Sequence, residues 1–136
     1  MGILIRKAGQ AQADKDLKDW GSLTWLASGN LENAEGVTVG RVVIKKGQAN
    51  PPHAHNNCEE VLYLLHGRLE HWVGDEMAVM EPGDTITIPA GVKHNARSIG
   101  DEDAEMMVVY ASAYRDMVEI QFTRLQDTGG KQEVPG

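Results

Sequence analysis

Several kinds of residue are scarce in this chain of 136 residues, and each scarcity excludes something. Cys58 is the single cysteine, so no disulfide can form within the chain, which agrees with a reducing cytoplasmic location. Acidic residues outnumber basic ones by 20 to 13, and a nucleic-acid or anionic-membrane partner would require the reverse. The apolar run at residues 3–5 is too short for a secretory signal or a membrane span. We therefore expect a cytoplasmic protein with no nucleic-acid or membrane partner.

Long amphipathic helices are also missing, and short stretches of β-branched and apolar residues take their place. Turn signals such as Pro82-Gly83 separate them. The expected strands are residues 20–28, 37–44, 60–65, 69–73, 77–80, 85–88, 94–99, 106–112 and 117–122. This pattern predicts one all-β domain, a sandwich or barrel of about ten short antiparallel strands. The expected organisation is an N-terminal arm at 1–19, with at most a turn or two of helix, a β-barrel domain at 20–122 and a flexible C-terminal tail at 123–136.

The stretch from Gly47 to Gly67, GQANPPHAHNNCEEVLYLLHG, has the strongest chemical pattern in the sequence. His53 and His55 are two residues apart, so their side chains share one side of an extended chain. The preceding Pro51-Pro52 disfavours a helix there. Glu60 follows after five residues, and two imidazoles with a carboxylate are typical of a metal site.

A second stretch, GDTITIPAGVKHNARS at residues 83–98, contains His94 directly after a Pro-x-Gly turn. This position puts the imidazole at the start of a strand. If the two stretches pack together, His94 joins His53, His55 and Glu60 in a set of three imidazoles and one carboxylate. Such a set leaves coordination positions open on a metal that takes five or six ligands, as catalysis requires. The alternative is a group of polar residues at a barrel mouth without a metal.

These two stretches resemble the cupin superfamily, specifically its small single-domain, metal-binding members. Residues 47–67 fit the pattern G-x5-H-x-H-x4-E-x6-G, and residues 83–98 fit G-x5-P-x-G-x2-H-x3-N except that Ser98 replaces the final Asn. The resemblance covers residues 37–112. It implies a jelly-roll type cupin β-barrel, a homodimer, and one divalent transition metal per chain: Fe, Mn, Ni, Co or Zn. It also implies that the metal ligands are the four matched residues His53, His55, Glu60 and His94.

Two further residues are candidates for substrate binding. If the row that contains Arg41 in residues 37–44 faces inward, its buried guanidinium needs an anion such as a substrate carboxylate. If the row faces outward, Arg41 is an ordinary surface charge. Tyr110, late in the strand expected at 106–112, is a similar candidate. No catalytic residue can be named from the sequence.

The remaining candidates near the motif are expected to be bystanders. Glu59 points away from Glu60 by strand alternation, Cys58 packs beside the site, and His66 lies in a turn. A two-residue hairpin at Gly67-Arg68 would pair Leu64 with His71, roughly 13 Å from Glu60 and too far for a ligand. His71 is then a hydrogen-bonded core histidine.

The resemblance favours an enzyme acting on a small oxygen-bearing substrate. Cupins with these ligands include dioxygenases, oxalate-type decarboxylases, isomerases and lyases, and the fold does not choose among them. We expect a dioxygenase or other oxidoreductase. The alternatives are a non-redox isomerase, epimerase, or lyase or decarboxylase, and a non-catalytic module that binds a sugar or small acid.

Overall fold

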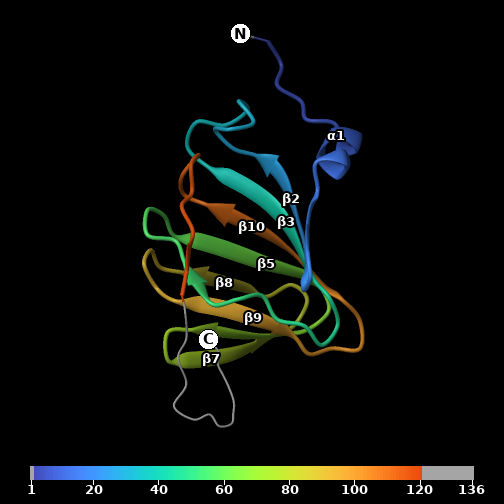
Figure 1. Cartoon of the computed structure of the whole chain (residues 1–136), viewed down its shortest axis with the longest axis vertical. Helices are drawn as coiled ribbons and strands as arrows, with labels where there is room; N and C mark the ends of the chain where they lie inside the picture. The colour runs from blue at the N-terminus through green and yellow to red at the C-terminus, as the bar shows by residue number, and fades with distance from the viewer. Residues whose placement is uncertain (1, 121–136) are drawn as a thin grey trace.

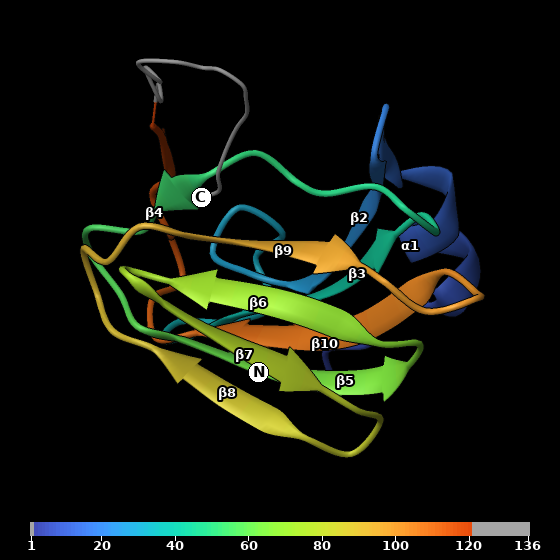
Figure 2. The same ribbon diagram turned by 90° about the horizontal axis from the view of Figure 1, so that it is seen from below.

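The computed structural model describes residues 2–120, which form two antiparallel β-sheets facing each other (Figures 1 and 2). The elements are α1 (Ala8–Ala13), β1 (Asp16–Lys18), β2 (Gly21–Ala27), β3 (Thr38–Ile44), β4 (His53–Ala54), β5 (Glu60–His66), β6 (Leu69–Val73), β7 (Glu76–Met80), β8 (Thr85–Ile88), β9 (His94–Ser98), β10 (Ala104–Tyr110) and β11 (Val118–Glu119). Six strands form one sheet in the order β1-β2-β3-β10-β5-β8, and five form the other in the order β11-β4-β9-β6-β7. This architecture confirms the predicted all-β, jelly-roll type fold.

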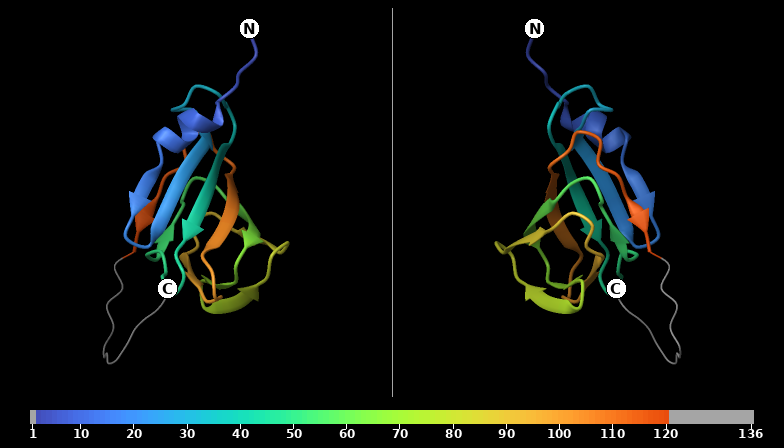
Figure 3. Two further views of the ribbon diagram at one scale, coloured as in Figure 1. Left: turned by 90° about the vertical axis from the view of Figure 1, so that its right-hand side faces the viewer. Right: turned by 90° about the vertical axis from the view of Figure 1, so that its left-hand side faces the viewer.

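The core lies between the two sheets because buried and exposed residues alternate along the central strands. In β3, Val42 and Ile44 point inward and are buried, whereas Arg41 points the other way and is exposed. In β10, Met106 and Val108 are buried in the same way. The period of two places one apolar face of each strand against the opposite sheet. Figure 3 shows the six-stranded sheet edge-on, with β2, β3 and β10 side by side.

The strands expected from the sequence are present, with the unexpected short strand β4 at the histidine motif and two differences at the ends of the chain. Strand β1 pairs with β2, so the segment expected as an arm contributes to the six-stranded sheet. Strand β11 occupies two residues of the expected 117–122, and the expected tail at 123–136 lies outside the described residues. Within residues 2–120, no helix has the length and apolarity needed to cross a membrane.

The hairpin expected between β5 and β6 is absent, and the predicted pairing of Leu64 with His71 is wrong. Leu64 pairs with Met106 of β10, whereas His71 pairs with Ala96 of β9 in the other sheet. Gly67 makes the crossing between sheets possible: its φ is +86°, and a Cβ there would lie 2.7 Å from the main chain. His71 therefore faces the space between the sheets rather than a hairpin end.

Residues 111–117, here called the strap, connect β10 to β11 along one end of the sheets (Figure 1). Hydrogen bonds attach the strap to the neighbouring segments of the chain. Ala111 donates its N–H to the carbonyl of Glu59, and the carbonyl of Ala113 accepts the N–H of Gly29. Asn57 donates its side-chain N–H to the carbonyl of Tyr114. These bonds hold the strap beside the loop that carries the histidine motif.

Candidate metal centre

Four potential ligands meet at the end of the sheets nearest the strap. His53 begins β4, Glu60 begins β5, and His94 begins β9, while His55 directly follows β4. β4 and β9 are neighbours, and His53 is paired in register with His94. One ligand atom from each of these four residues lies within 4.8 Å of every other, and they are here called the ligand cluster: His53, His55, Glu60 and His94.

Each imidazole of the ligand cluster is oriented by a backbone carbonyl. The Nδ1 atoms of His53, His55 and His94 lie 2.8 Å from the carbonyls of Pro51, Asp116 and Val92, respectively. A carbonyl oxygen only accepts, so each Nδ1 carries the proton and donates. The neutral ring therefore presents the lone pair of Nε2, which is the arrangement found in metal-ligating histidines.

These lone pairs face a carboxylate, an arrangement that calls for a cation. The Nε2 atoms of His94 and His55 lie 3.2 Å and 3.3 Å from the same oxygen, Oε1 of Glu60. The Nε2 atom of His55 is buried without a hydrogen-bond donor or acceptor partner. In a neutral ring with its proton on Nδ1, Nε2 has no proton to donate, so both contacts would set a lone pair against the carboxylate unless a cation lies between them. The donor set of three nitrogens and one oxygen fits a divalent transition metal.

The pKa shifts favour the ligand forms of these groups. Burial would raise the pKa of the Glu60 carboxyl, but without a metal the hydrogen bonds and charge of protonated His55 and His94 outweigh burial and hold it below its usual range. Burial, with the charge of His94, lowers the pKa of His53 from 6.5 to about 3. At neutral pH the carboxylate is ionised and the imidazole of His53 is neutral, as metal ligands must be.

A cavity of about 260 Å³ opens from the ligand cluster into the space between the sheets. Much of its wall on the six-stranded sheet is apolar and consists of Leu23, Val42, Ile44, Leu62, Met106 and Val108, while Asp16 and Lys18 of β1 also line the cavity. Polar residues also line it, among them His71, Tyr110 and Arg115. The cavity can therefore hold an organic molecule with an apolar body and polar ends.

The two substrate-binding candidates have different positions. Tyr110 lines the cavity, is 4% exposed, and packs edge-on against His55 with ring centroids 4.8 Å apart. Burial raises the pKa of its phenol well above the usual value, so the hydroxyl keeps its proton. The substrate-binding interpretation of Arg41 is not supported. Arg41 points outward from β3, and its Nε lies 3.2 Å from Oε2 of Glu105. The alternation of β3 places the row that contains Arg41 on the outer surface, so Arg41 is an ordinary surface charge.

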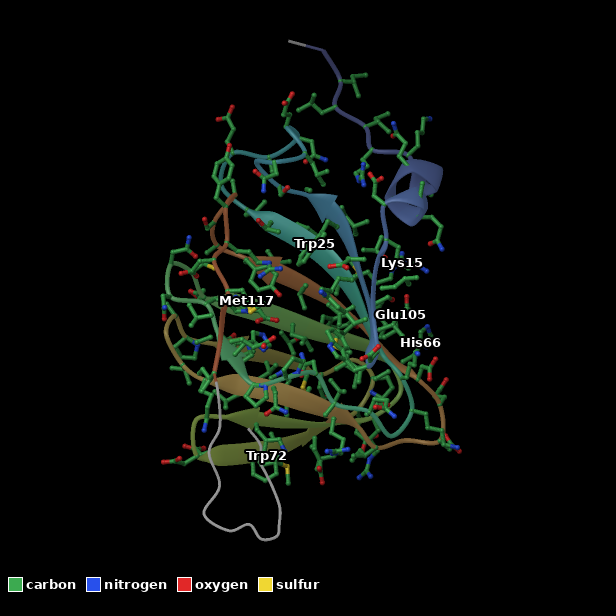
Figure 4. The ribbon with its side chains drawn as sticks, in the orientation of Figure 1. Lys15, Trp25, His66, Trp72, Glu105 and Met117 are labelled. Carbon is green, nitrogen blue, oxygen red and sulfur yellow. The ribbon has the colours of Figure 1, made fainter. Side chains whose placement is uncertain are left out.

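The expected bystanders lie outside the ligand cluster. Glu59 is exposed and Cys58 is buried, with burial as the main cause of the raised pKa of its thiol. Figure 4 places His66 at the opposite end of the strands from Met117 of the strap. Ser98, which departs from the motif, is fully buried, and its hydroxyl donates to the carbonyl of Glu102 across a turn. The departure therefore affects a turn contact and none of the ligands.

Two cavity residues, His71 and Arg115, were not recognised from the sequence as part of the site. His71 is 2% exposed and stacks on His94 with ring centroids 6.2 Å apart. Burial is the main cause that lowers its pKa from 6.5 to about 4, and a backbone hydrogen bond with Trp72 opposes this shift. Arg115 lies on the strap, outside both motifs. The alternation of apolar and polar residues in β6 was the signal for the inward side of His71, whereas no local pattern marks Arg115.

Residues 40–110 match the family described as Cupin domain. The chain is a cupin. Its match covers the central strands, the ligand cluster and most of the cavity wall, and it confirms the predicted family.

Proteins similar to this cupin differ in what they do. The polyketide synthase CurC of Streptomyces cyaneus is 27% identical, across 92% of this chain and 90% of that protein. Oxalate oxidase GF-3.8 of Triticum aestivum is also 27% identical, across 85% of this chain. This cupin spans about half, 51%, of the length of that oxidase.

Among solved structures, oxalate decarboxylase of Bacillus subtilis, which has Mn(II) centres, superimposes with a TM-score of 0.75. The match covers 82% of this chain and 31% of that one at 18% identity. At this identity the likeness establishes the shared fold alone.

Proposed function

We propose that this cupin is a mononuclear metalloenzyme that acts on a small oxygen-bearing organic substrate. The observation that carries the proposal is the set of Nε2 lone pairs that face the buried carboxylate of Glu60. The metal ligands are the ligand cluster, and the candidates remain Fe, Mn, Ni, Co and Zn. Manganese is the first to test because a structural relative has Mn(II) centres. When bound, the metal supplies a Lewis acid for substrate oxygens and, if it is Fe or Mn, a redox centre.

The cavity indicates a substrate larger than oxalate. Liquid water occupies roughly 30 Å³ per molecule, so a cavity of about 260 Å³ has room for several times the volume of a two-carbon acid. Oxalate consists of two carboxylates and has no apolar part, yet one wall of the cavity is aliphatic. The apolar wall would hold the body of the substrate, and Tyr110 would orient it beside His55.

We favour an oxidoreductase, of the dioxygenase type, for this reaction. Three neutral imidazoles and one carboxylate leave a bound divalent ion with one net positive charge, which favours an anionic or enolisable chelating substrate. The oxalate oxidase relative supports redox chemistry on this scaffold, although it is 27% identical and about twice as long. The residues of this chain would exclude bulk water through the aliphatic wall and hold the substrate oxygens toward the ligand cluster.

A non-redox isomerase, epimerase or lyase is the second candidate, and His71 favours it. Such a reaction needs a group that moves a proton to or from the substrate. His71 lines the cavity, and burial keeps it neutral by lowering its pKa to about 4. CurC, a relative named as a polyketide synthase, matches nearly the full length of this chain, and enolisable carbonyls suit this chemistry.

Metal content tests the metalloenzyme proposal directly. Elemental analysis of the purified and Mn- or Fe-reconstituted protein should give close to one metal ion per chain. The double variant His53→Ala/His94→Ala should give almost none, because it removes two of the four proposed ligand side chains. Equal and negligible metal in both proteins after reconstitution would refute the proposal.

Oxygen uptake separates the two reaction classes. The metal-loaded protein is given a panel of phenols, β-diketones and α-keto acids in air and under anaerobic conditions. Oxygen consumption coupled to substrate loss supports an oxidase or dioxygenase. Turnover that proceeds equally without oxygen would instead establish the non-redox alternative, and binding without turnover would establish the non-catalytic one.

We also propose that the protein is a cytoplasmic homodimer. Tyr63 and Val109 lie on the outer face of the six-stranded sheet and remain 43% and 39% exposed, which is the kind of surface that a second copy covers. Light scattering coupled to size-exclusion chromatography tests the dimer, and cell fractionation tests the location. A monomer at micromolar concentration would contradict the former.

A further inference from the structure

Arg115 occupies an unusual position for a charged residue. It lies on the strap and lines the same cavity as the ligand cluster. Its guanidinium carbon lies 4.4 Å from the ring centroid of Trp25 and 5.1 Å from that of Tyr110. Two aromatic rings therefore hold the cation by cation–π contacts and fix its orientation.

Arg115 differs from the other arginines of the described chain in having no anionic or carbonyl partner. The others pair with a carboxylate or a backbone carbonyl: Arg6 with Asp14, Arg41 with Glu105, Arg68 with Glu81 and Arg97 with Gly47. Among residues 2–120, neither a carboxylate nor a carbonyl makes such a contact with the Arg115 guanidinium. Its five N–H donors are therefore available to a hydrogen-bond acceptor on a ligand that enters the cavity.

The surrounding chain is built to keep Arg115 in this place. Trp25 packs directly over Gly40, where an added Cβ would lie 2.7 Å from the indole ring. Glycine therefore makes room for the Trp25 ring, here called the platform, on which the Arg115 guanidinium rests. The neighbour of Arg115 in the strap, Asp116, accepts the backbone N–H groups of Asn56 and Asn57 at 2.7 Å and 3.2 Å. The platform and the strap are thus each fixed independently of any ligand.

We propose that Arg115 is a substrate-binding residue that selects an organic anion. This rests on the proposed function of the same cavity. The ring of Tyr110 contacts both His55, at 4.8 Å, and Arg115, at 5.1 Å, so Arg115 lies within the sum of these distances, about 10 Å, of the His55 ring. A small organic acid can therefore reach Arg115 with a carboxylate while another oxygen reaches the ligand cluster and its apolar body rests on the aliphatic wall.

The chemistry of the guanidinium sets the class of ligand. Its planar fork of donors matches the two oxygens of a carboxylate, and a bond between two charged groups is stronger than a neutral one. A neutral amide of the same shape cannot form this stronger hydrogen bond between two charged groups. We therefore expect a carboxylate to bind on the order of tenfold to a hundredfold more tightly than its amide.

Benzoate and benzamide form a matched pair of probes for this preference. Each is titrated at pH 8 into the chelator-treated, metal-free full-length protein, with tryptophan fluorescence as the signal because Trp25 touches Arg115, and with calorimetry as a second measurement. We expect the wild type to prefer benzoate and Arg115→Gln to bind both probes equally. Arg41→Gln is the matched control, because it removes a surface arginine outside the cavity, and it should keep the full preference.

Two results would overturn the proposal: a wild type that binds benzoate no more tightly than benzamide, or a preference that survives in Arg115→Gln. If Arg115→Gln does not fold, as judged by circular dichroism, Arg115→Lys decides. It keeps the charge but loses the fork, so the preference should fall several-fold, and an unchanged preference counts against the proposal. Because no metal is present, failure here is distinct from failure of the metal-content test.

Discussion

The two ends of the cavity are built in different ways. In the ligand cluster, three imidazoles are oriented by carbonyls, and for His53 and His94 the acceptor is two residues away in the chain. At the other end, Arg115 is held by Trp25 and Tyr110, which come from β2 and β10. The first end uses local geometry, whereas the second depends on which strands become neighbours.

Because the two ends of the cavity are built in different ways, we expect substitutions to change the reaction type and the substrate preference separately. The proposed metal site needs a fixed spacing of the ligand cluster, so a substitution there should alter metal binding. The Arg115 end needs only aromatic platforms and an anchored strap, so its side chains can be exchanged without moving the metal ligands. We therefore place the reaction type in the ligand cluster and the choice of substrate in the strap and its neighbours.

The largest effect expected at the ligand cluster comes from Glu60→Gln. The substitution removes the anion that opposes the metal charge and leaves three imidazoles as ligands. Loss of one partner from a buried charged pair costs about 3–5 kcal/mol, so metal affinity should fall by at least about a hundredfold. Competition with a fluorescent chelator measures it. Glu59→Gln, at the exposed neighbour, is the control and should match the wild type. Equal affinities of the two variants would contradict the assignment of Glu60.

Acid should destabilise the metal-free protein through its buried histidines. Burial lowers the pKa of His71 from 6.5 to about 4, so the unfolded chain binds more protons than the folded one between these pH values. The stability contribution is complete above pH 6.5 and is lost as the pH falls toward 4, by up to about 3 kcal/mol. Urea unfolding at several pH values should show this slope, and His71→Phe should reduce it. A variant with an unchanged slope would show that His71 does not contribute.

Much of the fold and nearly all of the ligand cluster follow from the sequence, because both depend on short-range patterns. Short β-branched and apolar stretches between turn signals predicted the strands, and the spacing of His53, His55 and Glu60 placed three ligands on one loop and one strand end. The Pro-x-Gly turn before His94 placed the fourth. Bringing His94 to the other three ligands required the two stretches to pack together, which the resemblance to cupins implied.

What could not be predicted depends on strand pairing across the two sheets. The short link at Gly67 suggested a hairpin, but the chain crosses to the other sheet there, and His71 consequently faces the cavity. Arg41 could not be assigned to a face because Val37, Val39 and Val43 beside it are as apolar as the inward row. Arg115 has no local pattern at all, since its platforms lie far away in the sequence.

Gly40→Ala is expected to disturb the Arg115 end and leave the ligand cluster intact. The added Cβ would lie 2.7 Å from the Trp25 ring, which must move. Such overpacking costs about 1–3 kcal/mol, and the change should appear in thermal unfolding and in the tryptophan spectrum while metal content stays at the wild-type level. At exposed Gly36 nothing lies within 4 Å of an added Cβ, so Gly36→Ala is the control and should be neutral or slightly stabilising. A loss of metal in Gly40→Ala would show that the two ends are coupled.

Asp116→Ala tests the place where the strap meets the ligand cluster. The Asp116 carbonyl accepts the Nδ1–H of His55, while its carboxylate holds the backbone of Asn56 and Asn57. Alanine keeps the carbonyl but releases the carboxylate anchor, so His55 should lose orientation without losing its acceptor. We expect about a tenfold loss of metal affinity, at the low end for residues that support metal ligands, together with a weaker preference for benzoate over benzamide. Asp101→Ala, at an exposed turn, should change neither. If Asp116→Ala weakens benzoate binding but leaves metal affinity unchanged, the strap serves only the Arg115 end, and the separation of the two ends is complete.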